Sequence, residues 1–188
     1  MRYRPNDLLA LVRTPPGRRR FLGWAYYAGW PVFATLASVW RRTLLRRARV
    51  VCVVGSLGKT TTARAVATAL GEALYPSMGG AWGHAAFPLL RARPGQRHIV
   101  VEVAIAGPGQ MSRYPPILRP DLAVVTSIGS EHNRSLGTLE RTRHEKAEMV
   151  RSLPATGRAI LNGDDPNVRW MAGSVSSPNA LASSTPQT

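Results

Sequence analysis

The stretch that most constrains the fold runs from residue 50 to residue 62 and reads VVCVVGSLGKTTT. Its valines predict a buried strand, its two glycines a tight turn, and its lysine with three threonines the start of a helix. In such a unit the backbone N–H groups of the turn and of the helix N-terminus face an anion. The segment is therefore a candidate phosphate-binding loop, with phosphate-binding residues Gly55, Ser56, Leu57, Gly58, Lys59, Thr60 and Thr61.

Two side chains of this loop carry the expected chemistry. Lys59 is placed to add a positive charge near the β- and γ-phosphates of a nucleotide, and Thr60 to offer its hydroxyl to Mg²⁺. Val53 stands where the longer G-x-x-x-x-G-K-[ST] pattern has its first glycine, so the chain carries the shorter G-x-x-G-K-T-T pattern. The alternative is an ordinary strand–turn–helix unit in which the glycines only turn the chain.

The distribution of basic residues singles out two lysines. The chain contains 23 arginines but only Lys59 and Lys146. An arginine serves wherever a positive charge suffices, so a retained lysine is a candidate for chemistry that a guanidinium cannot perform. The alternative for Lys146 is chance retention.

Apolar runs and helical periodicity predict an α/β fold beyond the loop. Strands are expected at residues 98–104, 121–128 and 158–162, and helices at 60–74, 138–153 and, more briefly, 85–90. Their alternation indicates a mainly parallel sheet with P-loop NTPase-like topology. The expected organisation is a basic, aromatic-rich segment over residues 1–48, an ATP-binding domain over 49–173, and a disordered polar tail over 174–188.

Three further side chains are candidate site residues, because ligands gather at the carboxyl ends of parallel strands. Glu102 ends an apolar strand and is a candidate Mg²⁺ ligand, unless its carboxylate points out of an edge. His132 follows the next strand and could meet a second metal or a phosphate oxygen, although a loop histidine is often only a surface residue. Lys146 shares a helix face with Val150 and Leu153, which turns it inward, unless its stem merely snorkels.

The N-terminal segment has a composition suited to membranes. Residues 1–50 hold eleven arginines and one acidic residue, Asp7, and residues 21–40 (FLGWAYYAGWPVFATLASVW) hold no charge. Three arrangements fit: a spanning helix, a helix on a membrane surface through residues 18–49, and a soluble helical hairpin packed on the domain. A nucleic-acid partner is disfavoured, because no recognised nucleic-acid motif accompanies the basic residues.

The cysteine content bears on the compartment. Cys52 is the single cysteine, so no disulfide framework forms, which favours a reducing environment. The expected location is cytoplasmic, and the inner face of the membrane is the alternative position within it if the N-terminal segment binds lipid.

Five segments between residues 49 and 172 occur in the order found in one enzyme family. They are GSLGKTTT at 55–62, VEV and GPGQM within 101–111, RPDLAVVTSIGSEH at 119–132, LGTLE and EKAE within 136–148, and AILNGDD at 159–165. In this order they resemble the central ATP-binding domain of the Mur ligases of cell-wall synthesis. The Gly-Pro-Gly turn and the Lys-Ala-Glu stretch are most similar to the member that adds D-alanyl-D-alanine to the muramyl tripeptide.

The resemblance implies an ATP-dependent ligase that joins a small-molecule carboxylate to an amine. ATP phosphorylates the carboxylate, and the amine attacks the acyl phosphate to give an amide, ADP and phosphate. By the family pattern, Thr60 and Glu102 bind one Mg²⁺ and His132 a second. Lys146 is carbamylated by CO₂ and helps to hold the second metal, which requires a neutral amine that inward placement favours.

The sequence also departs from the family pattern. Ser127 replaces an expected asparagine, and residues 77–84 (SMGGAWGH) replace an asparagine-rich loop. Only about fifty residues precede the loop and a polar tail ends the chain, which leaves two alternatives for the C-terminal domain of the family: a separate chain supplies it, or it is lost from a truncated gene. A membrane-associated ligase of the poly-γ-glutamate type and a non-catalytic ATP-binding regulatory module remain as alternatives; a general P-loop kinase or transporter ATPase lacks its other signatures.

Overall fold

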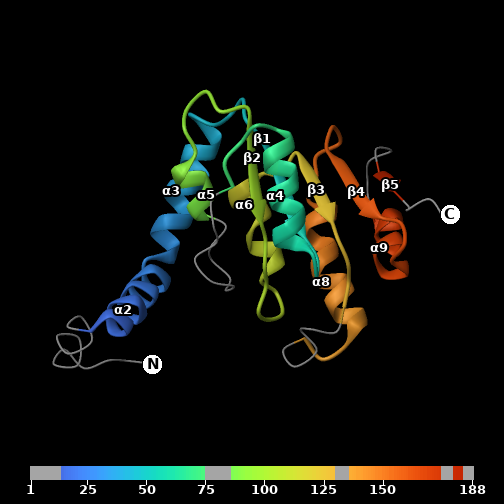
Figure 1. Ribbon diagram of the computed structural model, residues 1–188, viewed down its shortest axis with the longest axis horizontal. Coiled ribbons are helices and arrows are strands. Elements are labelled where there is room, and N and C mark those ends of the chain that lie inside the picture. The colour runs from blue at the N-terminus through green and yellow to red at the C-terminus, as the bar shows by residue number, and fades with distance from the viewer. Residues whose placement is uncertain (1–13, 75–85, 130–135, 175–179, 184–188) are drawn as a thin grey trace.

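A computed structural model of the chain describes residues 14–74, 86–129, 136–174 and 180–183. Its centre is a five-stranded sheet in the order β2-β1-β3-β4-β5, in which every neighbouring pair is parallel (Figure 1). The strands are β1 (Arg49–Val54), β2 (His98–Glu102), β3 (Leu122–Val125), β4 (Arg158–Asn162) and β5 (Ala180–Ser183). The predicted α/β architecture with a parallel sheet is confirmed.

Helices cover both faces of this sheet. One face packs on α4, and the other packs on helices that include α3, α5, α6, α8 and α9. The helices are α2 (Pro15–Ala28), α3 (Trp30–Arg42), α4 (Lys59–Ala69), α5 (Ala86–Arg91), α6 (Pro115–Leu118), α8 (Leu139–Arg151) and α9 (Pro166–Trp170), with 3₁₀ turns η1 (Met111–Arg113) and η3 (Met171–Ser174).

Alternation along β1 builds the two layers of the core. Val51 and Val53 face α4, where they meet Ala63 and Ala67. The intervening residues Val50, Cys52 and Val54 face the larger core on the opposite side. Burial raises the pKa of the Cys52 thiol, so this group is neutral and unreactive in the folded chain.

The predicted elements are confirmed within a few residues at their ends, with one correction. Residues 180–183 were expected to lie in a disordered tail, but they form β5, whose backbone pairs with β4 from Ala159 to Asn162. The prediction of disorder is wrong for these four residues. The four residues are Ala-Leu-Ala-Ser, with no β-branched side chain, so the strand is recognised only by its pairing with β4.

The uncharged stretch 21–40 is divided between two helices at Gly29. Pro31 follows in the first turn of α3, a position that suits proline. Within the described residues, no helix combines the length and hydropathy that crossing a membrane requires.

The second of these helices is part of the main core. Trp30 and Ala37 of α3, and Leu45 after it, are buried among the residues that cover the sheet. The Trp40 indole also donates a hydrogen bond to the Ala92 carbonyl oxygen beyond α5, at 3.2 Å. The helix therefore packs against the strand-containing domain.

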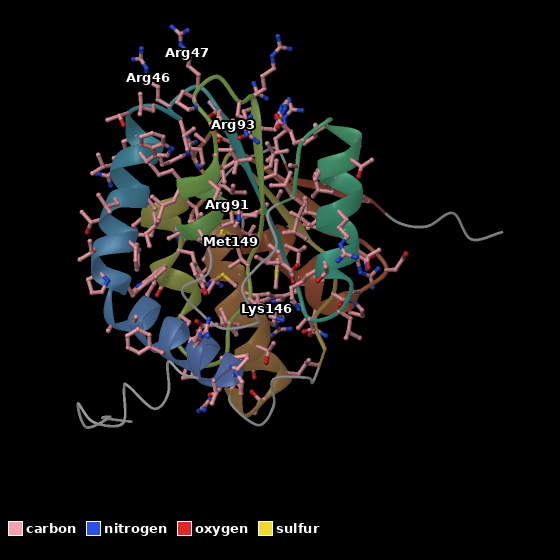
Figure 2. The ribbon with its side chains drawn as sticks, turned by 60° about the vertical axis from the view of Figure 1, so that its left-hand side comes forward. Arg46, Arg47, Arg91, Arg93, Lys146 and Met149 are labelled. Atoms are coloured by element: carbon pink, nitrogen blue, oxygen red, sulfur yellow. The ribbon has the colours of Figure 1, made fainter. Side chains whose placement is uncertain are left out.

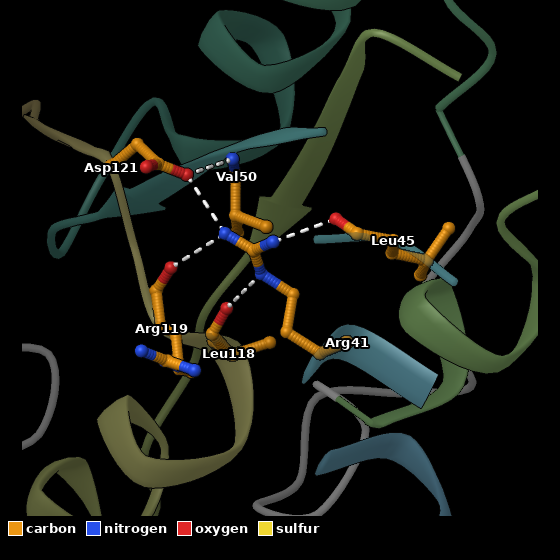
Figure 3. Close-up of polar contacts among 6 residues, drawn as sticks. All are labelled: Arg41, Leu45, Val50, Leu118, Arg119 and Asp121. Atoms are coloured by element: carbon orange, nitrogen blue, oxygen red, sulfur yellow. Dashed lines mark hydrogen bonds and ion pairs between the residues drawn. The ribbon is translucent and has the colours of Figure 1, made fainter. Parts of the chain in front are cut away.

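Arg41 is the polar anchor of α3 (Figure 3). Its guanidinium is 3.0 Å from the Asp121 carboxylate and donates to three carbonyl oxygens, those of Leu45, Leu118 and Arg119. Asp121 in turn accepts from the Val50 N–H at 2.8 Å. Burial lowers the pKa of Arg41 and the Asp121 charge opposes that shift, so the guanidinium stays charged while fixing α3 to the amino ends of β1 and β3.

Candidate nucleotide-binding site

The predicted phosphate-binding loop lies between the end of β1 and the start of α4. Gly55 has φ of 149° and Gly58 has φ of 80°, conformations that side chains rarely tolerate. A Cβ atom at residue 55 would lie 2.0 Å from the Thr126 hydroxyl oxygen. Glycine is thus required at residue 55 both by backbone conformation and by the close approach of β3.

The residues that follow β3 hold this loop in place. The Ser56 N–H donates to the Ser127 carbonyl oxygen at 2.7 Å, and the Leu57 N–H to the Ser127 hydroxyl at 3.0 Å. The Thr126 hydroxyl donates to the Leu57 carbonyl oxygen at 2.6 Å. These supporting hydroxyls were not among the predicted site residues, although two hydroxyl residues directly after an apolar strand are a usable signal for this edge.

Both lysines of the chain meet at Ser56. The Lys59 ammonium donates to the Ser56 carbonyl oxygen at 2.5 Å, and the Lys146 ammonium to the Ser56 hydroxyl at 2.8 Å. Lys146 comes from α8 and is 1% exposed, so the predicted inward orientation is confirmed. Figure 2 shows it inside the molecule. The fold therefore brings Lys146, which lies 90 residues after Ser56 in the sequence, onto the phosphate-binding loop.

Those of the remaining predicted ligands that the structure describes lie at the same edge of the sheet as the loop. Glu102 ends β2 opposite Val53 of β1, and is half-buried. Thr60 and Thr61 are exposed in the first turn of α4. A threonine hydroxyl and a carboxylate are hard oxygen donors of the kind that suits Mg²⁺, which keeps several of its waters.

The second predicted metal position is not described by the structure. His132 lies outside the described residues. Across the described ranges, no cluster of three or more His, Cys, Asp or Glu side chains forms a metal site. The assignment of His132 therefore stays a prediction.

Glu145, next to Lys146 in sequence, fixes the glycine-rich turn after β2. One carboxylate oxygen accepts from the Gly109 N–H at 3.0 Å and the other from the Met111 N–H at 2.9 Å. Glu145 was not among the predicted site residues. A carboxylate beside an inward-facing lysine was the available signal, but its partners lie 34 and 36 residues earlier.

Asp165 is a second carboxylate that sequence analysis left without a role. It caps α9 by accepting from the Asn167 and Val168 N–H groups, and it also accepts from the Ile128 N–H at 2.8 Å. It thereby joins the end of β4 to the segment after β3 that supports the loop. An aspartate directly before a proline is a typical helix start, which could have revealed the capping contact.

Comparison with known proteins places this geometry in a family. The model of the Mur ligase middle domain matches residues 53–184. The chain belongs to the Mur ligase family. The match begins within β1 and ends directly after β5, so it includes the loop, Glu102 and Lys146.

The names of similar curated proteins agree with this membership in the Mur ligases. The UDP-N-acetylmuramoyl-tripeptide–D-alanyl-D-alanine ligase of Mycobacterium tuberculosis is 33% identical over 128 residues, 65% of this chain and 25% of the relative. The ligase of the same name from Bacillus subtilis is 34% identical over 122 residues, 63% of this chain and 27% of the relative. The chain spans about a quarter of the length of these curated relatives.

The solved Mur ligase that bears most directly on the loop is MurF ligase from Thermotoga maritima in complex with ADP. Its TM-score to this chain is 0.72 at 26% sequence identity, covering 84% of this chain and 37% of that one. A structure of MurF from Acinetobacter baumannii has a TM-score of 0.71 at 20% identity, covering 81% and 34%, and supports the fold alone.

Proposed function

We propose that this chain is the ATP-binding domain of a carboxylate–amine ligase that acts in peptidoglycan precursor synthesis. The observation that carries the proposal is the contact of Lys146 with Ser56, which places a buried amine from α8 on a phosphate-binding loop. The names of the relatives support amide-bond formation over a purely regulatory use of ATP. The ADP complex of the related ligase supports the nucleotide.

The described residues divide the work of phosphate binding. The loop N–H groups from Gly55 to Thr60 and the Lys59 ammonium neutralise phosphate oxygens, which is the main electrostatic task in phosphoryl transfer. When a phosphate binds, the Lys59 ammonium donates to a phosphate oxygen in place of the Ser56 carbonyl oxygen. ATP, when bound, supplies the phosphoryl group that activates the carboxylate toward the amine.

The metal and carbamate assignments extend this division. Thr60 and Glu102 would hold one Mg²⁺ ion, and His132 would contribute to a second. Lys146, once carbamylated by CO₂, carries a carboxylate next to Ser56. An amine can undergo this modification, whereas a guanidinium cannot. The inward position of Lys146 supports this role, because it holds the amine against the phosphate-binding loop.

The substrates and partners follow from the relatives. The carboxylate is of the UDP-N-acetylmuramoyl-tripeptide class and the amine of the D-alanyl-D-alanine class, as in the names of the relatives. The reaction takes place in the cytoplasm, at the inner face of the membrane.

Calorimetry of the full chain with ATP and Mg²⁺ tests the nucleotide assignment. We expect micromolar binding that the Lys59→Ala variant loses, since the variant removes the charge that faces the phosphates. Arg64→Ala is the matched control, because Arg64 is an exposed cation on the same helix, five residues beyond Lys59. Equal affinity of wild type and Lys59→Ala would show that the loop does not bind the phosphates.

A further inference from the structure

The outward face of α3 carries an apolar stripe. Val32, Leu36 and Val39 repeat at intervals of four and three residues and are 61%, 52% and 54% exposed. Leu44, just beyond the helix, is 50% exposed. We call these four residues the α3 stripe. The opposite face of the helix enters the core, through Trp30, Ala37 and Arg41. The α3 stripe therefore takes no part in the core.

A cleft rich in arginine lies beside the end of the same helix. It has a volume of about 780 Å³ and separates the end of α3 from α6, the start of β3 and the end of α8. We call it the arginine cleft; its arginines are Arg41, Arg42, Arg46, Arg119 and Arg151. Both of its carboxylates are engaged, Asp121 with Arg41 and Glu148 with Arg151.

The arginine cleft therefore has unbalanced positive charge. Arg42, Arg46 and Arg119 are exposed, and none of them pairs with a carboxylate in the described part of the chain. The sequence carries no Asp or Glu between Asp7 and Glu72, so acidic side chains are remote from this region along the chain. Figure 2 shows Arg46 and Arg47 projecting from the end of the molecule where α3 finishes.

The α3 stripe and the arginine cleft adjoin at the end of α3. Arg42 is the last residue of α3, three positions after Val39, and it also lines the cleft. Arg46 lines the same cleft two positions after Leu44. The Arg41 anchor holds this end of α3 against β1 and β3 (Figure 3), so apolar and cationic groups keep a fixed relation.

We propose that the α3 stripe and the arginine cleft dock the chain on an anionic lipid bilayer. Val32, Leu36 and Val39 enter the headgroup region with α3 lying in the plane of the membrane, while the arginine cleft receives a lipid phosphate. Guanidinium groups suit that phosphate because they bind it through paired N–H donors. A second copy of the chain suits the surface less well, since it presents the same cationic groups.

This docking orients the nucleotide-binding site. The arginine cleft adjoins the amino end of β3, whereas the phosphate-binding loop lies at the carboxyl ends of the strands. The loop thus points away from the cationic edge and stays open to soluble substrates. The inference deepens the proposed location at the membrane and is independent of ATP binding.

Co-sedimentation of the full chain with vesicles tests the docking surface. We expect binding to phosphatidylcholine vesicles that contain phosphatidylglycerol, little binding to phosphatidylcholine alone, and weakening by salt. Leu36→Glu and the double variant Arg42→Glu/Arg46→Glu should each lower the affinity by at least about tenfold. The controls are Leu70→Glu, at the exposed residue that directly follows α4, and the single charge reversal Arg64→Glu, on the exposed face of α4; both lie on the other face of the sheet.

Three results would overturn the docking surface. The first is vesicle binding by the variants that equals that of the wild type. The second is unchanged vesicle binding by Leu36→Glu with displacement of the wild type by soluble glycerol phosphate, which would make the cleft a site for free phosphate esters. The third is a dimer in sedimentation velocity that Leu36→Glu abolishes, with no vesicle binding. ATP calorimetry on the same variants distinguishes failure of the docking surface from failure of the proposed function. None of the variants changes a residue of the loop, so each should bind ATP as the wild type does.

Discussion

Lys146 is the residue on which the ligase proposal depends most. It is 1% exposed and donates to the Ser56 hydroxyl, while the chain uses arginine almost everywhere else. If it is carbamylated, ¹³C-labelled bicarbonate should give a carbamate carbon resonance in the full chain that Lys146→Met loses. Methionine is an unbranched side chain that can fill the same space, so the fold should persist.

Lys59→Met is the matched control for this experiment, because Lys59 is the other lysine and also contacts Ser56. We expect it to keep the carbamate resonance, and any signal from the N-terminal amine should be common to all variants. A spectrum in which Lys146→Met and the wild type are identical would mean that Lys146 is a structural lysine.

At the same scale, the sequence predicts some site residues better than others. The orientation of Lys146 follows from helical periodicity, because Val150 and Leu153 mark the buried face of α8. Local patterns offer signals for Thr126, Ser127 and Glu145, but they do not reveal which groups these side chains contact. Each depends on which backbone groups of a distant segment lie opposite, and that is decided only when the sheet assembles.

Among the elements, α3 is held by the buried Arg41 side chain in addition to its apolar contacts. Arg41→Ala would remove the guanidinium that donates to the Asp121 carboxylate and to the carbonyl oxygens of Leu45 and Leu118. We expect the free energy of unfolding to fall by about 3 kcal/mol in urea denaturation, near the lower limit for a broken buried pair, because the Asp121 side chain is 37% exposed.

Arg42→Ala is the matched control for this loss of stability. Arg42 is the next residue in the same helix and is exposed, so its removal should change the free energy of unfolding by no more than about 0.5 kcal/mol. Equal stability of the two variants would show that α3 is held by its apolar contacts alone.

Elements built on dense local patterns were predictable, and those built on distant partners were not. β1 to β4 follow from apolar runs with polar, glycine or proline boundaries, and α8 begins at the capping Thr138. β5 has a short, weakly apolar sequence and depends on pairing with β4. The burial of Arg41 is equally hidden, because its partner Asp121 lies 80 residues later.

The whole molecule includes the N-terminal helix in its core, although composition divides the chain near residue 49. Trp30, Ala37 and Leu45 belong to the core that covers one face of the sheet. Burial of one large apolar side chain contributes about 1.5–3 kcal/mol, and a typical domain is stable by only about 5–15 kcal/mol. Loss of Trp30, Leu45 and the Arg41 anchor together therefore removes much of the stability of the domain.

We accordingly expect a fragment of residues 48–188 to lose its fixed tertiary structure although it retains the whole phosphate-binding loop. It should bind the dye ANS, lose its near-ultraviolet circular dichroism, and fail to bind ATP in calorimetry. A fragment of residues 14–188, which keeps α2 and α3, should behave as the full chain does. Cooperative unfolding and undiminished ATP affinity of the shorter fragment would make α3 an appendage. If the shorter fragment instead fails, the helix proposed to dock on the bilayer cannot be separated from the domain that binds the nucleotide. Attachment to the membrane and integrity of the site would then share one element.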